Sequence, residues 1–301
     1  MIRVLVTGAS GFIGSSLIKH LSSLGMEVAG SSRSSRSSST LLELSPESES
    51  FDRVLFSQFD VVVHCAARVH QMRKHDQDES LFYRDNVLFS RRVAEACLSA
   101  GVSHFIFFSS IKVVGESTSL LPFCAQSIPN PQDAYGRSKW MAEQTLIECV
   151  RGKEMSLSIV RIPLVYGSGA KGNLAMLERF AAKGVPMPFG GIQNRRSLLG
   201  LRNLCEFISY LISHGGEKGR SEMFLLADSR PVSTPEVYTY LGKRHGKTLY
   251  LPSLPTVFWR SLEQIPQLQQ IVNRLTSDLE IDISDTVRST GWTPRYAALT
   301  D

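Results

Sequence analysis

The stretch TGASGFIG, residues 7 to 14, decides the fold of this 301-residue chain. It follows the apolar run IRVLV and opens a helical pattern that ends at Gly25, so Gly8, Gly11 and Gly14 lie between a strand and a helix. Glycines allow a tight turn there and let a pyrophosphate approach the backbone N–H groups at the positive end of the helix. The stretch therefore predicts a dinucleotide-binding unit, although a glycine-rich turn in another α/β protein could have the same residues.

Short apolar runs alternate with helical patterns over the first two-thirds of the chain. Near-continuous apolar strands between helices are typical of a parallel sheet that is covered on both faces. The expected fold class is α/β, with a Rossmann-type doubly wound parallel sheet and a smaller C-terminal substrate lobe. The expected strands are residues 2–6, 27–30, 60–67, 104–110 and 157–162, and the expected helices are residues 12–24, 81–100 and 135–151.

The sequence pattern changes after Pro163, where short segments rich in glycine and proline begin. One later apolar run, MFLLA at residues 223 to 227, is expected to rejoin the sheet, so the second lobe is assembled from separate pieces. The expected NAD(P)-binding Rossmann domain covers residues 1–165 with a returning segment at about 208–228, and the lobe comprises residues 166–207 and 229–301.

Composition excludes several classes of protein. The formal charge of +5 comes from scattered basic residues, which does not indicate a nucleic-acid partner. No apolar run is long enough to span a bilayer, and the chain begins with a strand pattern rather than a secretory signal. The amphipathic stretch at residues 257–275 is interrupted by Pro266 and predicts a helix pair rather than a membrane contact. Five cysteines without a CxxC pair indicate reduced thiols and a cytoplasmic location.

The stretch YGRSK at residues 135 to 139 carries a tyrosine and a lysine one helical turn apart. On one helix face, the Lys139 ammonium could lower the pKa of the Tyr135 phenol and bind a cofactor ribose. Ser109 and Ser110 end a predicted parallel strand, at the sheet edge where open α/β folds place their sites. Taken alone, such a Tyr–Lys pair usually lies on a solvent-exposed helix face. The two serines at the strand end are the observation that favours a catalytic role.

Together these motifs resemble the extended short-chain dehydrogenase/reductase family, specifically its nucleotide-sugar epimerases, dehydratases and reductases. The resemblance covers essentially the whole chain. Besides TGASGFIG, it rests on HCAARVH (64–70), Asn86 in RDNV, FFSSIKVVGE (107–116), AYGRSK (134–139), RIPLVYGSG (161–169), KGNL (171–174), NRRSLLGLRNL (194–204) and GWTP (291–294).

The resemblance implies a role for each matching residue. Ser110, Tyr135 and Lys139 would form the catalytic triad, in which Tyr135 moves the proton, Ser110 holds the sugar oxygen and Lys139 holds the nicotinamide ribose. Asn86 would steady the backbone of the active site and is counted with the substrate-binding residues. The cofactor contacts would come from Gly8, Ser10, Gly11, Phe12, Ile13, Gly14, Ala66, Ala67, Tyr135 and Lys139.

The same resemblance implies a substrate in the C-terminal lobe, a nucleoside-diphosphate sugar that is most simply UDP-linked. Asn173 and Arg196 match the positions that contact the diphosphate, and Arg195 is the rival for the second position. A guanidinium suits this task because its planar fork binds phosphate oxygens bidentately. A homodimer is possible, since many members dimerise. No metal is assigned, because strand alternation places His64 and Cys65 on opposite faces.

The serine-rich stretch SSRSSRSSST, residues 31 to 40, bears on the choice of cofactor. NAD-selective Rossmann domains place an acidic residue at the end of the second strand, and no carboxylate occurs here until Glu43. Arg33 and Arg36 instead offer positive charge to a 2′-phosphate. The stretch favours NADP(H), with NAD as the alternative; if the stretch is a disordered loop, only the missing acid counts.

Three functions stay open. An exchangeable NADPH favours reduction of a UDP-4-keto-6-deoxy-N-acetylhexosamine at C4, a step of surface polysaccharide synthesis. The alternative is a UDP-glucose/UDP-galactose (or N-acetyl) 4-epimerase, and the second alternative is a non-catalytic NADP-binding sensor or scaffold. A 4,6-dehydratase is disfavoured, because Ile111 and Lys112 follow Ser110 where that activity places an acidic pair.

Overall fold

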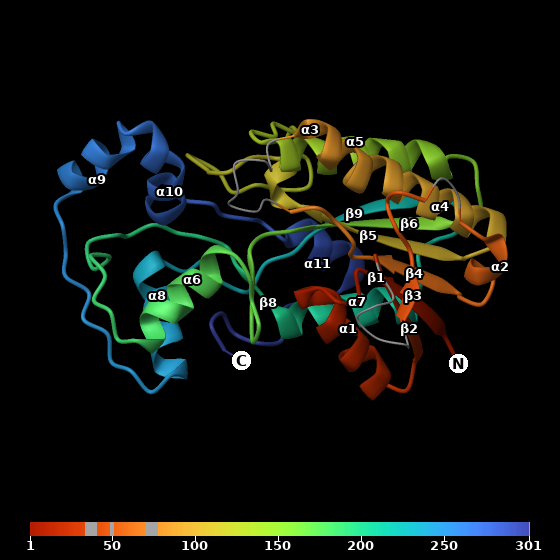
Figure 1. Ribbon diagram of the computed structural model, residues 1–301, viewed down its shortest axis with the longest axis horizontal. Helices are drawn as coiled ribbons and strands as arrows, with labels where there is room; N and C mark the ends of the chain where they lie inside the picture. Colours follow the sequence, from red (N-terminus) through yellow and green to blue (C-terminus); the bar gives the residue numbers. More distant parts are fainter. Residues whose placement is uncertain (34–40, 49–50, 70–77, 301) are drawn as a thin grey trace.

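A seven-stranded sheet in the order β3-β2-β1-β4-β5-β6-β9 forms the centre of the computed structural model, and all its neighbouring strands are parallel (Figure 1). The structure describes residues 1–33, 41–48, 51–69 and 78–300. The strands are β1 (Arg3–Thr7), β2 (Glu27–Ser32), β3 (Leu41–Glu43), β4 (Val61–His64), β5 (His104–Ser110), β6 (Ser156–Ile162) and β9 (Ser221–Leu225).

Helices cover both faces of this sheet, because successive strand residues point to opposite sides. Val4 and Val6 of β1 pack into one apolar core with α1 and α7, whereas Leu5 packs into the core on the other face with α4 and α5. Each fully buried aliphatic side chain stabilises such a core by about 1.5–3 kcal/mol. The doubly wound α/β architecture predicted from the sequence is confirmed. These helices are α1 (Phe12–Ser23), α4 (Phe89–Ala100), α5 (Ala134–Val150) and α7 (Leu201–His214).

Two short helical elements, η3 (Tyr83–Leu88) and η4 (Ile111–Val113), lie near the edge of the sheet at which the parallel strands end. The segment η3 is π-helical and leads directly into α4, and η4 is a 3₁₀ turn after β5. Single π-helical turns inside longer helices are frequent at functional sites. Two helices of four residues are also present: α3 (Glu79–Phe82) leads into η3, and α2 (Arg53–Phe56) precedes the start of β4.

A second lobe lies beside the sheet and has its own apolar core (Figure 1). The predicted helix pair around Pro266 is confirmed as α9 and α10, which pack against each other. Within the described residues, no helix is long and apolar enough to cross a membrane. The elements of the lobe are β7 (Val165–Tyr166), β8 (Leu199–Gly200), α6 (Asn173–Ala182), α8 (Thr234–Arg244), α9 (Thr256–Glu263) and α10 (Pro266–Thr276).

Two C-terminal pieces return to the sheet. Strand β9 pairs with β6 as expected, and the short helix α11 (Ser284–Thr290) contacts β9. The expected boundary between residues 207 and 208 falls inside α7, whose buried face packs on the sheet from Leu204 onward. Helix α7 as a whole begins at Leu201, and the division into two domains stays a prediction.

Candidate active site

The glycine loop between β1 and α1 has the tight geometry that its sequence predicted. Gly8 has a φ of 70°, and a Cβ at this position would lie 2.9 Å from the Ala66 backbone. A Cβ on Gly14 would lie 2.4 Å from the Gly8 carbonyl oxygen. The two positions exclude side chains, so the loop packs closely between the start of α1 and the loop after β4.

The N-terminus of α1 faces this loop with its backbone donors. The helix begins at Phe12 after Gly11, and no side chain caps it. Uncapped N–H groups at the positive end of a helix bind phosphate oxygens. A dinucleotide diphosphate therefore fits this position, and Ser10, Phe12, Ile13, Ala66 and Ala67 lie in the two segments that border it.

His64 at the end of β4 belongs to a buried polar network rather than to a metal site. Its Nδ1 lies 2.9 Å from Thr7 Oγ1, and its Nε2 lies 3.0 Å from Ser90 Oγ. Burial lowers the pKa of His64 to about 3, so the ring is neutral at physiological pH. Among the described residues, no three His, Cys, Asp or Glu side chains gather in a way that could hold a metal ion.

Ser110, Tyr135 and Lys139 come together at the carboxyl end of the sheet. Ser110 ends β5, and its hydroxyl hydrogen-bonds the Tyr135 phenol. Tyr135 lies in the first turn of α5, where the Asp133 carboxylate accepts a hydrogen bond of 2.7 Å from the Gly136 N–H and caps the helix. Lys139 follows one turn later, buried, with Nζ 3.9 Å from the centre of the Phe107 ring.

The pKa of Tyr135 differs from the sequence-based expectation that Lys139 would lower it. Burial raises the pKa of Tyr135 to about 12, partly offset by the hydrogen bond from Ser110. Burial also lowers the pKa of Lys139 to about 7. The nearby Glu143 carboxylate raises this pKa and offsets part of the shift. Desolvation penalises the charged form of both groups, and it outweighs the attraction by which Lys139 was expected to acidify the phenol.

Replacing Lys139 with Met is expected to stabilise the cofactor-free protein, with a larger gain at lower pH. The pKa of Lys139 falls from 10.5 to about 7 on folding, so the unfolded chain binds the extra proton between these values. The stability of the wild type therefore falls as pH decreases through this window, and Met removes that loss. Thermal unfolding at about pH 6 and pH 9 measures the effect, with the exposed Lys183→Met as control; a gain independent of pH would contradict this account.

Asn86 connects the loop after β4 to the helix that carries Tyr135 and Lys139. Its Oδ1 accepts a hydrogen bond of 2.7 Å from the Arg68 N–H, and its Nδ2 donates to the Arg68 carbonyl and to Ser138 Oγ. The side chain is fully buried. This position fits a residue that steadies the site backbone rather than one that contacts the substrate directly.

A buried ion pair lies below the triad. Arg161 of β6 donates from Nε and Nη2 to the two carboxylate oxygens of Glu143, at 2.9 and 2.7 Å. Ser109, the neighbour of Ser110 on β5, donates to Glu143 Oε1 at 2.5 Å. Glu143 follows Lys139 by one turn of α5, so the pair joins the three elements that carry or flank the triad.

The two arginines considered for the diphosphate lie in different surroundings. Exposed Arg195 forms an ion pair with Glu280, at 2.9 Å from Nε and 3.0 Å from Nη2. Arg196 is partly buried and donates to the Ser277 carbonyl; burial lowers its pKa, and the nearby charge of Arg274 adds to this shift. Arg274 Nη2 itself lies 3.8 Å from Glu116 Oε2, and the assignment of the diphosphate contact to Arg196 rather than Arg195 stays a prediction. Asn173 is the first residue of α6, which follows Gly172.

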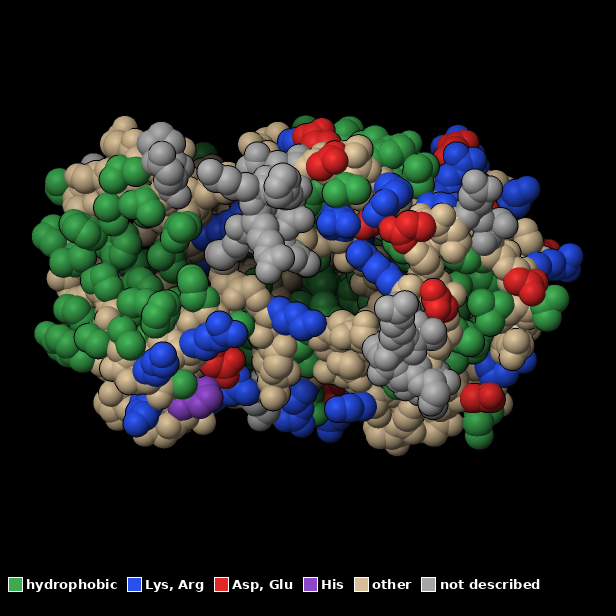
Figure 2. All heavy atoms as spheres, in the orientation of Figure 1, with side chains coloured by type: hydrophobic (Ala, Val, Ile, Leu, Met, Phe, Trp, Pro, Cys, Tyr) green, Lys and Arg blue, Asp and Glu red, His purple; other side chains and the backbone are tan. Residues whose placement is uncertain are grey.

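Arg33 of the serine-rich stretch contacts a carboxylate from a distant segment of the chain. Its Nη2 lies 3.4 Å from Oδ2 of Asp85 in η3. Arg36 lies outside the described residues. Figure 2 shows one face of the molecule, which is hollowed near its centre and has Lys and Arg side chains at the rim of the hollow.

Sequence reasoning missed several residues of this site. Glu143 was detectable, because it stands four residues after Lys139 on the same helix face. Arg161 was detectable as a lone charge in an apolar strand, which requires a buried partner. Lys112, considered only as an argument against dehydration, donates to the Asp133 carboxylate at 2.5 Å and to Glu116 at 2.8 Å. The pair with Glu116 has the local i,i+4 spacing, whereas the contact with Asp133 joins segments that only the fold brings together.

Comparisons with known proteins agree with this architecture. A UDP-glucose 4-epimerase from Vibrio cholerae is 36% identical over 298 residues, which cover 97% of this chain and 90% of that protein. The structure of MoeE5 in complex with UDP-glucose and NAD matches with a TM-score of 0.75 at 25% identity, over 99% of this chain and 95% of the other. A UDP-N-acetylglucosamine 4-epimerase structure from Bacillus cereus has the same fold, with a TM-score of 0.78 at 19% identity over the same shares.

The family assignment follows from these matches together with the site. The NAD dependent epimerase/dehydratase family matches residues 4–227, which contain the glycine loop, the triad and β9. The resemblance stated from the motifs is thereby confirmed. The chain belongs to the NAD-dependent epimerase/dehydratase family of enzymes.

Proposed function

We propose that this protein is a UDP-sugar 4-epimerase, with UDP-glucose/UDP-galactose or their N-acetyl forms as substrates, that keeps NAD bound through turnover. The observation that carries the proposal is the match to the Vibrio cholerae UDP-glucose 4-epimerase over 97% of the chain. Such a match includes both the triad and the lobe where the substrate would bind. The complexes of MoeE5 with UDP-glucose and NAD support the same ligands.

The residues present fit a dinucleotide. The uncapped N-terminus of α1 offers N–H groups to the diphosphate, and the closely packed glycines leave no side chain in its way. Lys139 lies one helical turn from Tyr135 and would hold the nicotinamide ribose. A bound nicotinamide supplies reversible hydride acceptance, which no protein side chain provides.

The side chains of the protein would move the proton. Tyr135 would take a proton from the sugar 4-hydroxyl and return it to the same oxygen on the opposite face of the ring. Ser110, hydrogen-bonded to the phenol, would hold that oxygen within reach of Tyr135. With a pKa of about 12 in the protein without cofactor, the phenol is protonated at neutral pH and must lose this proton before it can accept one from the sugar hydroxyl. Removal of its proton is favoured when the Lys139 ammonium is charged.

The reductase was the main interpretation of the sequence, and the comparisons favour its alternative, the epimerase. They support NAD and give no support for the predicted NADP. The two activities separate in one experiment: the purified protein is incubated with UDP-glucose and with UDP-N-acetylglucosamine, without added cofactor. The 4-epimers are expected, detected by anion-exchange chromatography. If neither epimer forms and only a 4-keto sugar with NADPH reacts, the protein is the reductase.

Replacing Arg196 with Ala is expected to weaken binding of UDP by about 10- to 100-fold, because one charge-assisted hydrogen bond contributes about 1.5–3 kcal/mol. Calorimetric titration with UDP measures the change. Arg195→Ala is the matched control and is expected to bind UDP like the wild type, since Arg195 is paired with Glu280. A larger loss in the Arg195 variant would assign the diphosphate contact to Arg195.

A further inference from the structure

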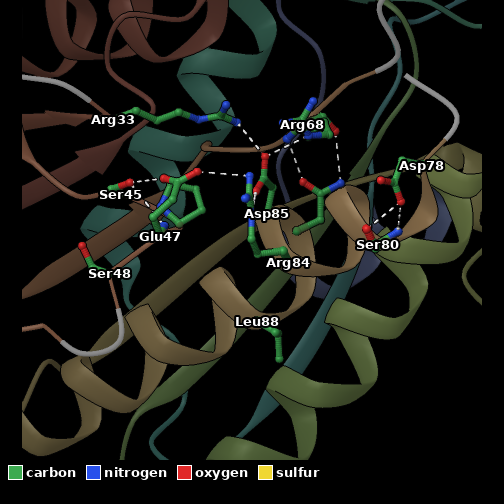
Figure 3. Close-up of polar contacts among 12 residues, drawn as sticks. Arg33, Ser45, Glu47, Ser48, Arg68, Asp78, Ser80, Arg84, Asp85 and Leu88 are labelled. Atoms are coloured by element: carbon green, nitrogen blue, oxygen red, sulfur yellow. Dashed lines mark hydrogen bonds and ion pairs between the residues drawn. The ribbon is translucent and has the colours of Figure 1, made fainter. Parts of the chain in front are cut away.

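Three arginines converge on one buried carboxylate, Asp85 (Figure 3). Arg68 Nε donates to Asp85 Oδ2 at 2.8 Å, and Arg84 Nε donates to Oδ1 at 2.7 Å. Arg33 Nη2 is the more distant third partner, 3.4 Å from Oδ2. The Asp85 side chain has no exposed surface, whereas that of Arg33 is 54% exposed. Asp85 is therefore the anionic centre of the cluster, and Arg33 is its solvent-facing member.

The sheet order places this cluster where a dinucleotide ribose would lie. Strands β2 and β4 flank β1 on its two sides, with Arg33 after β2 and Arg68 after β4. Their contacts with Asp85 therefore meet beside the carboxyl end of β1, from which the glycine loop starts. In Rossmann domains the end of the second strand is the position from which an acidic residue selects the ribose 2′-hydroxyl.

The cluster contains guanidinium groups, which attract a phosphate, and carboxylates, which repel it. Residues 30–33 contain no carboxylate, and the carboxylate that contacts Arg33 is that of Asp85 in η3. Arg84 has a second anionic partner, because its Nη2 lies 3.1 Å from Glu47 Oε1. A phosphate monoester carries close to two negative charges at neutral pH. The field of a buried carboxylate is weakly screened, so Asp85 repels such a group while it attracts the guanidinium that would bind it.

We propose that Asp85 makes the cofactor site selective for NAD(H) over NADP(H), acting from η3 in place of an acidic residue at the end of β2. It does so in two ways: it engages Arg33, and it cancels part of the positive charge that the three guanidinium groups would otherwise present to a 2′-phosphate. This inference rests on the proposed function in one respect, that the glycine loop binds a nicotinamide dinucleotide.

The test is the ratio of the dissociation constants for NADP⁺ and NAD⁺, measured by titration of protein from which cofactor has been removed. Asp85→Asn is expected to lower this ratio by about tenfold or more, because it removes the repulsion and releases Arg33. Adding Arg33→Ala to Asp85→Asn is expected to reverse most of the gain. Glu95→Gln is the control, since it removes a carboxylate whose partner is Arg91 on α4.

A surface variant keeps the test decisive if Asp85→Asn fails to fold. Arg33→Gln in the wild-type background is expected to change NADP⁺ affinity less than about threefold, because Asp85 already engages this guanidinium. A tenfold loss would show that Arg33 binds the phosphate in spite of Asp85 and would overturn the proposal. An unchanged or increased ratio in a folded Asp85→Asn variant would overturn it as well.

Failure of this inference is distinguishable from failure of the proposed function. A protein that binds NAD⁺ and converts UDP-sugars, but whose cofactor ratio does not respond to Asp85→Asn, refutes only the role of Asp85. A protein that binds neither dinucleotide refutes both, because the glycine loop would then have another ligand.

Discussion

Replacing Tyr135 with Phe is expected to lower the turnover of UDP-sugar epimerisation by about 10²- to 10⁴-fold. The phenol hydrogen-bonds Ser110 at the carboxyl end of β5, and Phe removes the group that would carry the proton of the sugar hydroxyl. The ring remains, so the helix start and the packing around it are preserved. Turnover is measured by product formation, and NAD affinity is measured on the same sample.

The matched control is Tyr250→Phe, which removes a phenol hydroxyl from a highly exposed residue of the C-terminal lobe. This variant is expected to keep full activity. Binding of NAD should be retained in both variants, since a change confined to turnover identifies Tyr135 as a catalytic residue. An active Tyr135→Phe protein would exclude the proposed mechanism, and a wild type that binds cofactor without turnover would favour the sensor or scaffold.

Replacing Arg161 with Ala is expected to lower the free energy of unfolding by about 3–5 kcal/mol. The substitution leaves the Glu143 carboxylate buried without its bidentate partner, between β5, β6 and α5. Urea denaturation measures the change, and the exposed Arg91→Ala is the control, expected to unfold close to the wild type. A loss no greater than that of the control would show that the buried pair does not hold these elements together.

A second variant separates loss of charge pairing from loss of packing. The double replacement Glu143→Leu and Arg161→Met removes both charges and keeps comparable volume, so it is expected to recover most of the stability. Activity gives a further readout, because Glu143 also accepts the hydrogen bond from Ser109 next to the triad residue Ser110. We expect the stable double variant to have lower turnover than the wild type, with its Tyr135 and Ser110 less well positioned.

The parts of the fold that were predictable from the sequence are those with a local signal. The glycine loop, the apolar strands and the helix break at Pro266 follow from backbone conformation and periodicity, and the structure confirms them. Strand β3 and the pair β7–β8 were missed because they contain only two or three residues each. Such strands are too short to show an alternation.

The site was predictable where spacing on one helix decided it, and less so where distant segments meet. Tyr135 and Lys139 followed from one helical turn, whereas their pKa values depend on burial that no spacing reveals. The interpretation of Arg33 as a phosphate ligand came from the composition of residues 31–40. Its contact with Asp85 depends on a π-helical turn far along the chain, so no local pattern indicated that partner.

The most direct test of the central claim uses UDP-galactose that carries deuterium at C4, incubated with the purified protein in the presence of added unlabelled NADH and NADPH. An epimerase that retains its cofactor returns the label to the same carbon, so the account predicts UDP-glucose with deuterium at C4 and no label in the added dinucleotides. Transfer of deuterium to the added pool, or no conversion of UDP-galactose by a folded protein, would contradict it.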